Sequence, residues 1–231
     1  MPLPVLYVVH QRRPATGRVA RILSALGYPG EVRRPIHGDD LPPTMDGHAA
    51  AVIFGGPMSA NDDSAYIREE IRWLEHVADS GKPILGICLG GQLLARAIGG
   101  EVHAHPLGHC EVGWHRVDPA DGAPPVFPEP THFYQWHAEG MSLPPDVEVL
   151  ATSDRFPVQA WRRQNAVGLQ FHPEVTESGM RFWVSRNLDR FLPMPGAQPA
   201  AEQFRSHVRH TPAVVQWVRT FLTSWVAGKL P

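Results

Sequence analysis

Short apolar runs alternate with amphipathic stretches along the first part of the chain. Continuous apolar runs predict strands buried on both faces at residues 3–9, 49–54 and 83–87. Apolar residues spaced along one helical face predict helices at residues 17–26, 64–78 and 92–98. Strands that alternate with helices in this way predict right-handed βαβ units on a parallel sheet.

The pattern changes after residue 100. Short strands separated by proline-rich turns are predicted at residues 112–117, 133–136, 147–151, 158–161 and 167–171. Successive short strands of this kind predict a second, smaller, partly antiparallel layer. A helix over residues 176–192 and a linker over 193–199 follow, so we expect a main domain at residues 1–192 and an extension at 193–231.

The extension has the pattern of a helical hairpin over residues 200–227, broken at Pro212, because proline removes a helical hydrogen bond. Trp217, Phe221 and Trp225 recur every four residues and form an aromatic stripe. We expect this stripe to pack on the main domain. A contact with a second copy or with a partner protein is the alternative.

Composition narrows the class of protein. The 231 residues are 43% hydrophobic, enough for a sizeable core, and 21 Lys and Arg against 23 Asp and Glu give a net charge of −2. This balance argues against a sequence-blind nucleic-acid binder or a membrane-surface binder. Two cysteines cannot build a disulfide framework, no apolar run is long enough for a membrane span, and the N-terminal charges follow the apolar run, the reverse of a signal peptide. We therefore expect a cytoplasmic protein.

The segment from residue 84 to 92, ILGICLGGQ, carries the most informative chemistry. A buried strand runs into Cys88, which has Gly86 and Gly90 on either side, and a helix follows at once. This is the layout of a nucleophile elbow, whose tight turn leaves no room for Cβ atoms at the glycines. The helix N-terminus favours the thiolate, and the Leu89 N–H could face an oxyanion.

A nucleophilic cysteine also needs a base that is itself oriented. His172 and Glu174 follow a predicted apolar strand, and residues two apart on an extended chain point to the same side. Pro173 keeps His172 out of the helical region and stiffens that geometry. Taken alone, either motif has a bland explanation as a buried cysteine or a surface pair. Together they predict a Cys-His-Glu triad.

These motifs resemble those of the class I, triad-type glutamine amidotransferases. The resemblance rests on the sequence GICLG at 86–90, QFHPE at 170–174 and FGGPMS at 54–59, which is similar to the family's oxyanion-hole loop. The segments GQLLA at 91–95 and QWHAEG at 135–140 are most similar to free-standing proteins related to the amidotransferase domain of GMP synthase. The resemblance implies an α/β, flavodoxin-like open sheet that is mostly parallel and flanked by helices.

The resemblance also implies roles for individual residues. Cys88 would be the nucleophile, His172 the general base and then acid, and Glu174 the orienting carboxylate. Gly56 and Leu89 would supply the oxyanion N–H groups, and Gln92 would line the glutamine pocket. His137 stands in a segment where relatives have His-Gly-Asp. Because this chain has Ala138 and Glu139 there, only a substrate-proximal role carries over for His137.

The predicted reaction is hydrolysis of glutamine through a thioester, with no metal and no cofactor. The chain has no glycine-rich phosphate cradle, so it is either the glutaminase half of a two-subunit enzyme, passing ammonia to a synthetase partner, or a stand-alone hydrolase of γ-glutamyl amides or peptides. The aromatic stripe of the C-terminal extension leaves a homo-oligomer open as a further expectation. A third alternative is a non-catalytic partner-binding module. A fourth is a zinc site at His103, His105, His109, Cys110 and His115.

Overall fold

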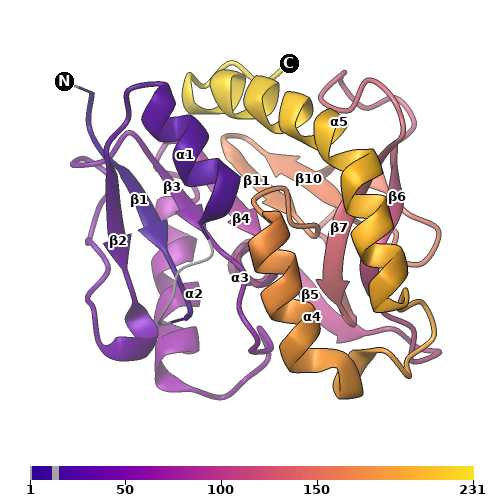
Figure 1. Ribbon diagram of the computed structural model, residues 1–231. Coiled ribbons are helices and arrows are strands. Elements are labelled where there is room, and N and C mark those ends of the chain that lie inside the picture. Colours follow the sequence, from indigo (N-terminus) through magenta and orange to yellow (C-terminus); the bar gives the residue numbers. More distant parts are fainter. Residues whose placement is uncertain (1, 12–15) are drawn as a thin grey trace.

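The computed structural model describes residues 2–11 and 16–231, without the side chains of residues 187–190. Its main feature is a nine-stranded sheet in the order β2-β1-β3-β4-β11-β10-β9-β6-β7 (Figure 1). Five neighbouring strands are parallel: β2 (Gly30–Arg33), β1 (Val5–Val8), β3 (Ala50–Ile53), β4 (Ile84–Ile87) and β11 (Ala166–Leu169). Four antiparallel strands continue the sheet: β10 (Ala160–Arg163), β9 (Glu148–Thr152), β6 (Glu111–Pro119) and β7 (Thr131–His137).

Helices cover both faces of this sheet. One face carries α1 (Gly17–Ala25), α4 (Glu177–Phe191) and α5 (Ala200–Val226), and the other carries α2 (Ala65–Val77) and α3 (Leu89–Ala97), as Figure 1 shows. A short 3₁₀ turn, η1 (Pro35–His37), follows β2. Successive strand residues face opposite cores: Val5 and Tyr7 join the core under α1 and α5, and Leu6 joins the core under α2. The α/β, flavodoxin-like class is therefore confirmed.

The antiparallel strands are placed differently from the prediction. Only β5 (Glu101–Ala104) and β8 (Glu139–Ser142) form a separate small antiparallel sheet, and the other strands extend the main sheet. The antiparallel part of the main sheet begins at a tight hairpin between β10 and β11, where Gln164 adopts a positive φ of 54°. Because a hairpin pairs each strand beside its predecessor, β10, β9, β6 and β7 continue the main sheet, and the smaller antiparallel layer consists of β5 and β8.

The C-terminal segment is one helix, so the predicted break at Pro212 was wrong. Pro212 lies on the exposed face of α5, and the residue one turn earlier, Val208, is 76% exposed. Water can therefore satisfy the carbonyl that loses its helical partner. Buried residues on the opposite face, including Val214 and Trp217, hold the helix on the core.

The aromatic stripe of α5 packs within the chain. Trp217, Phe221 and Trp225 are buried in the same core as the sheet, and Trp217 stacks on Phe127 with ring centroids 5.0 Å apart. The indole N–H of Trp217 donates to the Val126 carbonyl at 3.0 Å. The structure thus bears out packing on the main domain as the role of this stripe. Within the described part of the chain, no helix combines the length and apolar character that crossing a membrane requires.

Candidate active site

Cys88 occupies a strained turn between β4 and α3. Its φ and ψ are 51° and −111°, values that a residue with a side chain rarely adopts. Its backbone N–H donates to the Leu169 carbonyl at 2.7 Å, which ties the turn to β11. The residue is the N-cap of α3, so its thiol lies at the positive end of the helix. The strand-turn-helix geometry of a nucleophile elbow is present.

The two glycines of the elbow are required by close backbone contacts. A Cβ on Gly86 would lie 2.4 Å from the carbonyl oxygen of Gly90. A Cβ on Gly90 would lie 2.1 Å from the carbonyl oxygen of Ile53. Neither backbone neighbour can move away as a flexible side chain can, so any larger residue would displace α3 from β4. The steric explanation predicted from the sequence is confirmed.

The imidazole of His172 lies between Glu174 and Cys88. His172 Nδ1 and Glu174 Oε1 are 2.8 Å apart, and both side chains are buried. The pairing of β11 beside β4 brings the histidine to the cysteine, because both residues follow the carboxyl ends of adjacent parallel strands. Burial alone would lower the pKa of His172, but the charge of Glu174, with the charge and hydrogen bond of Cys88, raises that pKa to about 10. These interactions favour a protonated imidazole at His172.

A glycine loop after β3 closes over this pair. A Cβ on Gly55 would lie 3.0 Å from His172 Cε1 and 3.5 Å from Cys88 Cβ. A Cβ on Gly56 would lie 2.8 Å from His10 Cβ and 3.0 Å from a methyl group of Leu89. The loop backbone can lie this close to Cys88 and His172 at Gly55, and to His10 and Leu89 at Gly56, only because both residues lack a side chain.

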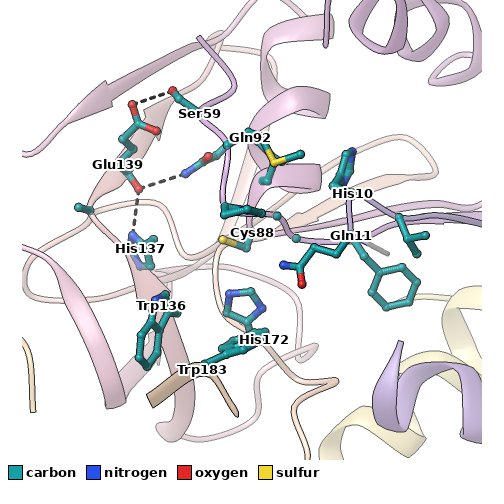
Figure 2. A pocket seen from close by; sticks show the side chains of 18 of the residues that line it. His10, Gln11, Ser59, Cys88, Gln92, Trp136, His137, Glu139, His172 and Trp183 are labelled. Atoms are coloured by element: carbon teal, nitrogen blue, oxygen red, sulfur yellow. Dashed lines mark hydrogen bonds between the residues drawn. The ribbon is translucent and has the colours of Figure 1, made fainter. Parts of the chain in front are cut away.

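All seven site residues predicted from the sequence line one cavity of about 380 Å³: Gly56, Cys88, Leu89, Gln92, His137, His172 and Glu174. Figure 2 shows polar side chains on one side of Cys88. There the Gln92 amide and the His137 ring converge on the Glu139 carbonyl, at 3.1 and 2.9 Å, and Ser59 Oγ donates to the Glu139 carboxylate at 2.9 Å. This side offers the hydrogen-bonding groups that an amino acid needs.

A buried network that the sequence did not predict stands behind His137. Its Nε2 lies 3.2 Å from Glu111, whose carboxylate also accepts hydrogen bonds from Gln159 and Ser153, both at 2.7 Å. Burial alone would raise the pKa of Glu111, but its hydrogen bond and charge interaction with His137, and the Ser153 hydroxyl, lower it. Sequence motifs assigned no role of its own to Glu111, the first residue of β6.

Gln170, the first residue of the QFHPE segment at 170–174, was also assigned no role from the sequence. Its amide Nε2 donates toward Cys88 Sγ at 3.8 Å, and its Oε1 accepts from Gln92 at 3.2 Å. The side chain is fully buried. It joins the sulfur to the polar side of the cavity, so it can stabilise negative charge on Cys88.

The opposite side of the cavity is aromatic. The Trp183 ring lies edge-on to His172, with centroids 4.7 Å apart, and Trp136 lies 6.0 Å from Trp183. Phe191 extends this wall, 5.8 Å from Trp136. Trp136 belongs to β7, whereas Trp183 and Phe191 belong to α4. Elements far apart in the sequence form this surface, which explains why no local motif indicated it.

A second buried histidine-carboxylate pair borders the cavity. His10 follows β1, and its Nε2 lies 3.0 Å from both carboxylate oxygens of Glu70, on α2. Both side chains are fully buried. Burial alone would lower the pKa of His10, but the charge of Glu70 and the hydrogen bonds of the ring raise it. The pair lies beneath the glycine loop, because His10 contacts Gly56.

The histidines considered as zinc ligands do not gather around a common point. His105 and His109 stack on each other, with ring centroids 4.7 Å apart. Across the residues that the structure describes, no group of three or more His, Cys, Asp or Glu side chains is arranged to hold a metal ion. His115 is buried, and that burial lowers its pKa.

Comparison with known proteins now places the chain in a family. Residues 16–187 match the family model of class-I glutamine amidotransferases, and this match covers most of the chain. The chain therefore belongs to the class-I glutamine amidotransferase family. The resemblance inferred from the sequence motifs is confirmed.

Individual relatives agree with this assignment. A GMP synthase (glutamine-hydrolyzing) from Aeropyrum pernix is 34% identical over 189 residues, which are 78% of this chain but 34% of that protein. A GMP synthase from Thermomicrobium roseum is 37% identical over 139 residues, which are 59% of this chain and 25% of that protein. This chain thus spans about a quarter to a third of these relatives.

Two further proteins are similar along most of their own length. One subunit of the GMP synthase (glutamine-hydrolyzing) from Ignicoccus hospitalis is 34% identical over 170 residues, which are 70% of this chain and 85% of that protein. The crystal structure of a glutamine amidotransferase from Methylobacillus flagellatus has a TM-score of 0.91 and 27% identity, covering 100% of this chain and 96% of that one. The structural comparison thus points to the same kind of protein as the family model.

Proposed function

We propose that this protein hydrolyses the γ-amide of glutamine or of a γ-glutamyl compound through a thioester on Cys88. The observation that carries the proposal is the contact of His172 with both Cys88 and Glu174 at the N-terminus of α3. A nucleophile, a proton carrier and an orienting carboxylate are the three parts that acyl transfer by a cysteine needs.

The first half of the reaction acylates the enzyme. The Cys88 thiolate forms a C–S bond to the γ-carbonyl carbon, and the carbonyl oxygen becomes an oxyanion. The N–H groups of Gly56 and Leu89 would hold that oxyanion, and each donor contributes roughly 3–4 kcal/mol to lowering the barrier. His172 then gives its proton to the nitrogen as the C–N bond breaks, releasing ammonia or an amine.

The second half restores the enzyme. His172, now neutral, takes a proton from water, whose oxygen attacks the thioester carbon. The C–S bond breaks, and glutamate leaves. Glu174 keeps Nδ1 of the ring protonated throughout, so Nε2 is the nitrogen that exchanges protons. The sum of both halves is one amide and one water converted to glutamate and an amine.

The polar side of the cavity supports recognition of the γ-glutamyl group. Gln92, His137 and the Glu139 segment present donors and acceptors within one hydrogen-bonded cluster. We assign Gln92 and His137 to substrate binding on this basis. The amino acid portion of the substrate would then lie toward Glu139, with its amide over Cys88.

The fate of the ammonia has two candidate forms. Similarity to a separate subunit of a GMP synthase favours a partner synthetase that accepts it. A stand-alone hydrolase is the second candidate, favoured by the aromatic wall beside His172. Both uses fit the cytoplasm, where the buried free thiols Cys88 and Cys110 stay reduced.

A release assay tests the proposed function. Ammonia from glutamine and amine from γ-glutamyl amides are measured with wild type, Cys88→Ala and, as a matched control, Cys110→Ala. We expect Cys88→Ala to lose at least about 10⁴-fold in kcat, as for other removed nucleophiles, while Cys110→Ala stays active. Turnover that survives in Cys88→Ala would contradict the proposal.

A further inference from the structure

We propose that Trp136, Trp183 and Phe191 form a leaving-group subsite, and that the preferred substrates are γ-glutamyl amides carrying an aromatic group on the amide nitrogen. This inference rests on the proposed function, because it assigns a side of the cavity relative to the reacting bond. It goes further by naming the class of amine released.

The cavity is divided into two chemically different sides. Figure 2 shows Gln92, Ser59 and Glu139 on one side of Cys88 and Trp183 on the other, next to His172; Trp136 lies between Trp183 and His137. The polar side is joined by hydrogen bonds through the Glu139 backbone and carboxylate. The aromatic side is joined by ring contacts at 4.7 to 6.0 Å. A substrate with one polar and one aromatic end matches both sides.

Proton transfer fixes which end of the substrate faces which side. The departing nitrogen must lie within hydrogen-bond reach of the His172 ring, since that ring protonates it. In Figure 2 the His172 ring lies across Cys88 from Gln92 and Glu139, so a group on that nitrogen would extend on the His172 side. The Trp183 ring stands edge-on to His172 in that direction, and Trp136 follows it. Free glutamine, which releases only ammonia, carries no group that would extend toward these rings.

The three rings of the aromatic wall are placed to contact a bound molecule. All three rings are only half-buried, and all three line the cavity. Aromatic rings favour edge-to-face or offset contacts with another ring at centroid separations of about 4.5–7 Å. An aliphatic amine buries less area and lacks this ring geometry. The same wall therefore favours an amine with an aromatic ring over a short aliphatic amine.

The covalent steps are unchanged by the larger amine. The C–S bond forms first and gives the oxyanion, and the C–N bond then breaks as His172 gives its proton to the nitrogen of the leaving amine. Water then cleaves the thioester. One γ-glutamyl amide and one water yield glutamate and one amine that carries the aromatic ring, with no oxidant, reductant or further reactant.

The test compares two amides whose amines have similar basicity, so that leaving-group chemistry cancels. They are γ-glutamyl-2-phenylethylamide and γ-glutamyl-propylamide, with glutamine as reference. We expect wild type to show a kcat/KM at least about tenfold higher for the phenyl compound, equivalent to about 1.4 kcal/mol. Glutamine turnover without any preference for the phenyl compound would overturn the inference and leave the proposed function intact. No turnover of any of the three would overturn both.

Variants locate the subsite. Trp136→Leu should lower the phenyl-to-propyl ratio of kcat/KM about fivefold or more, while a general loss of fold or activity would lower both values together. Phe182→Leu is the matched control: it changes an aromatic residue on α4 that is 49% exposed and does not line the cavity. Its ratio should equal that of wild type. An unchanged ratio in Trp136→Leu would overturn the inference, and inhibition of wild type by 2-phenylethylamine more than by propylamine provides a check without any variant.

Discussion

The parallel and antiparallel halves of the sheet contribute different parts of one cavity. The parallel strands end in the proposed nucleophile, its base and the residues around them: His10 after β1, the glycine loop after β3, Cys88 after β4 and His172 after β11. The antiparallel strands and the small sheet supply Trp136, His137 and Glu139, to which we assign recognition of the substrate. Carboxyl ends of parallel strands meet at one edge, which concentrates chemistry there.

The two halves also differ in what holds their groups in place. The reactive groups depend on backbone geometry, such as the strained Cys88 turn and the glycines around it. The recognition groups depend on side-chain hydrogen bonds, such as those that join His137, Glu111 and Gln159. Substitutions in the parallel half of the sheet should therefore reduce kcat, and substitutions in the antiparallel half should mainly raise KM.

The largest effect is expected at the orienting carboxylate of the parallel half. Glu174→Gln should lower kcat roughly 10²–10⁴-fold, because the His172 ring loses its fixed tautomer and its charge partner. Glu177→Gln, which changes an exposed carboxylate nearby, should have no such effect. A kcat within a few-fold of wild type for Glu174→Gln would show that His172 needs no orienting partner.

The same variant makes a prediction about pH. His172 must be protonated to release the amine, and its pKa is raised to about 10, so wild-type acylation should persist until the pH approaches that value. Removing the negative charge of Glu174 lowers the pKa of His172, so the alkaline limb of kcat/KM should move to lower pH. A limb that stays in place would exclude His172 as its source.

The second effect concerns stability in the parallel half. Glu70→Gln should lower the free energy of unfolding by about 2 kcal/mol, since it removes the charge that faces His10 in a fully buried site. Glu69→Gln, on the exposed side of the same helix, is the control. Denaturant unfolding measures both.

This stability difference should depend on pH. The pKa of His10 is raised by Glu70 in the folded protein, so its contribution is fully present below the ordinary histidine pKa of about 6.5. The contribution is lost as the pH rises through the higher folded value. The gap between wild type and Glu70→Gln should therefore be larger near about pH 6 than in alkaline solution. A gap that widens with pH would contradict the ion pair.

The third effect belongs to the antiparallel half. Glu111→Gln should raise KM for the γ-glutamyl substrate about tenfold, with a smaller change in kcat, because His137 loses a carboxylate partner at 3.2 Å. Glu101→Gln, an exposed carboxylate on β5, should behave as wild type. A fall in kcat with KM unchanged would mean that the two halves do not divide their roles.

The smallest effect is expected at the edge of the polar side. Ser59→Ala removes the hydroxyl that donates to Glu139 at 2.9 Å, a bond worth about 1 kcal/mol, so KM should rise only several-fold. Ser178→Ala, exposed on α4, is the control. Steady-state kinetics with both variants would detect the change, and an effect as large as that of Glu111→Gln would reverse the expected order.

The reactive half was predictable from sequence because its parts are local. Gly86, Cys88 and Gly90 define a strand-turn-helix within a few residues, and His172 and Glu174 lie two residues apart after an apolar strand. Local spacing fixes the geometry of each motif, and the order of parallel strands then brings the motifs together. Little long-range information was needed.

The recognition half was not predictable in the same way. Glu111, Ser153 and Gln159 come from separate segments that meet only through antiparallel pairing, and Trp183 reaches the cavity from a helix. Strand register and helix placement decide these contacts, and neither can be read from a single run of residues. Pro212 failed as a breaker for a related reason, because packing of α5 on the core outweighed the local preference.

Site-specific labelling would test the central claim most directly. The folded protein would be treated with a glutamine-derived electrophile, such as 6-diazo-5-oxo-norleucine, and the modified peptide identified by mass spectrometry. The account predicts one adduct, on Cys88, that glutamine or a γ-glutamyl amide suppresses and that His172→Ala slows. Cys110 should stay unmodified, because burial raises the pKa of its thiol to about 11. A folded protein that gains no adduct at Cys88, or that reacts equally at Cys110, would contradict the account.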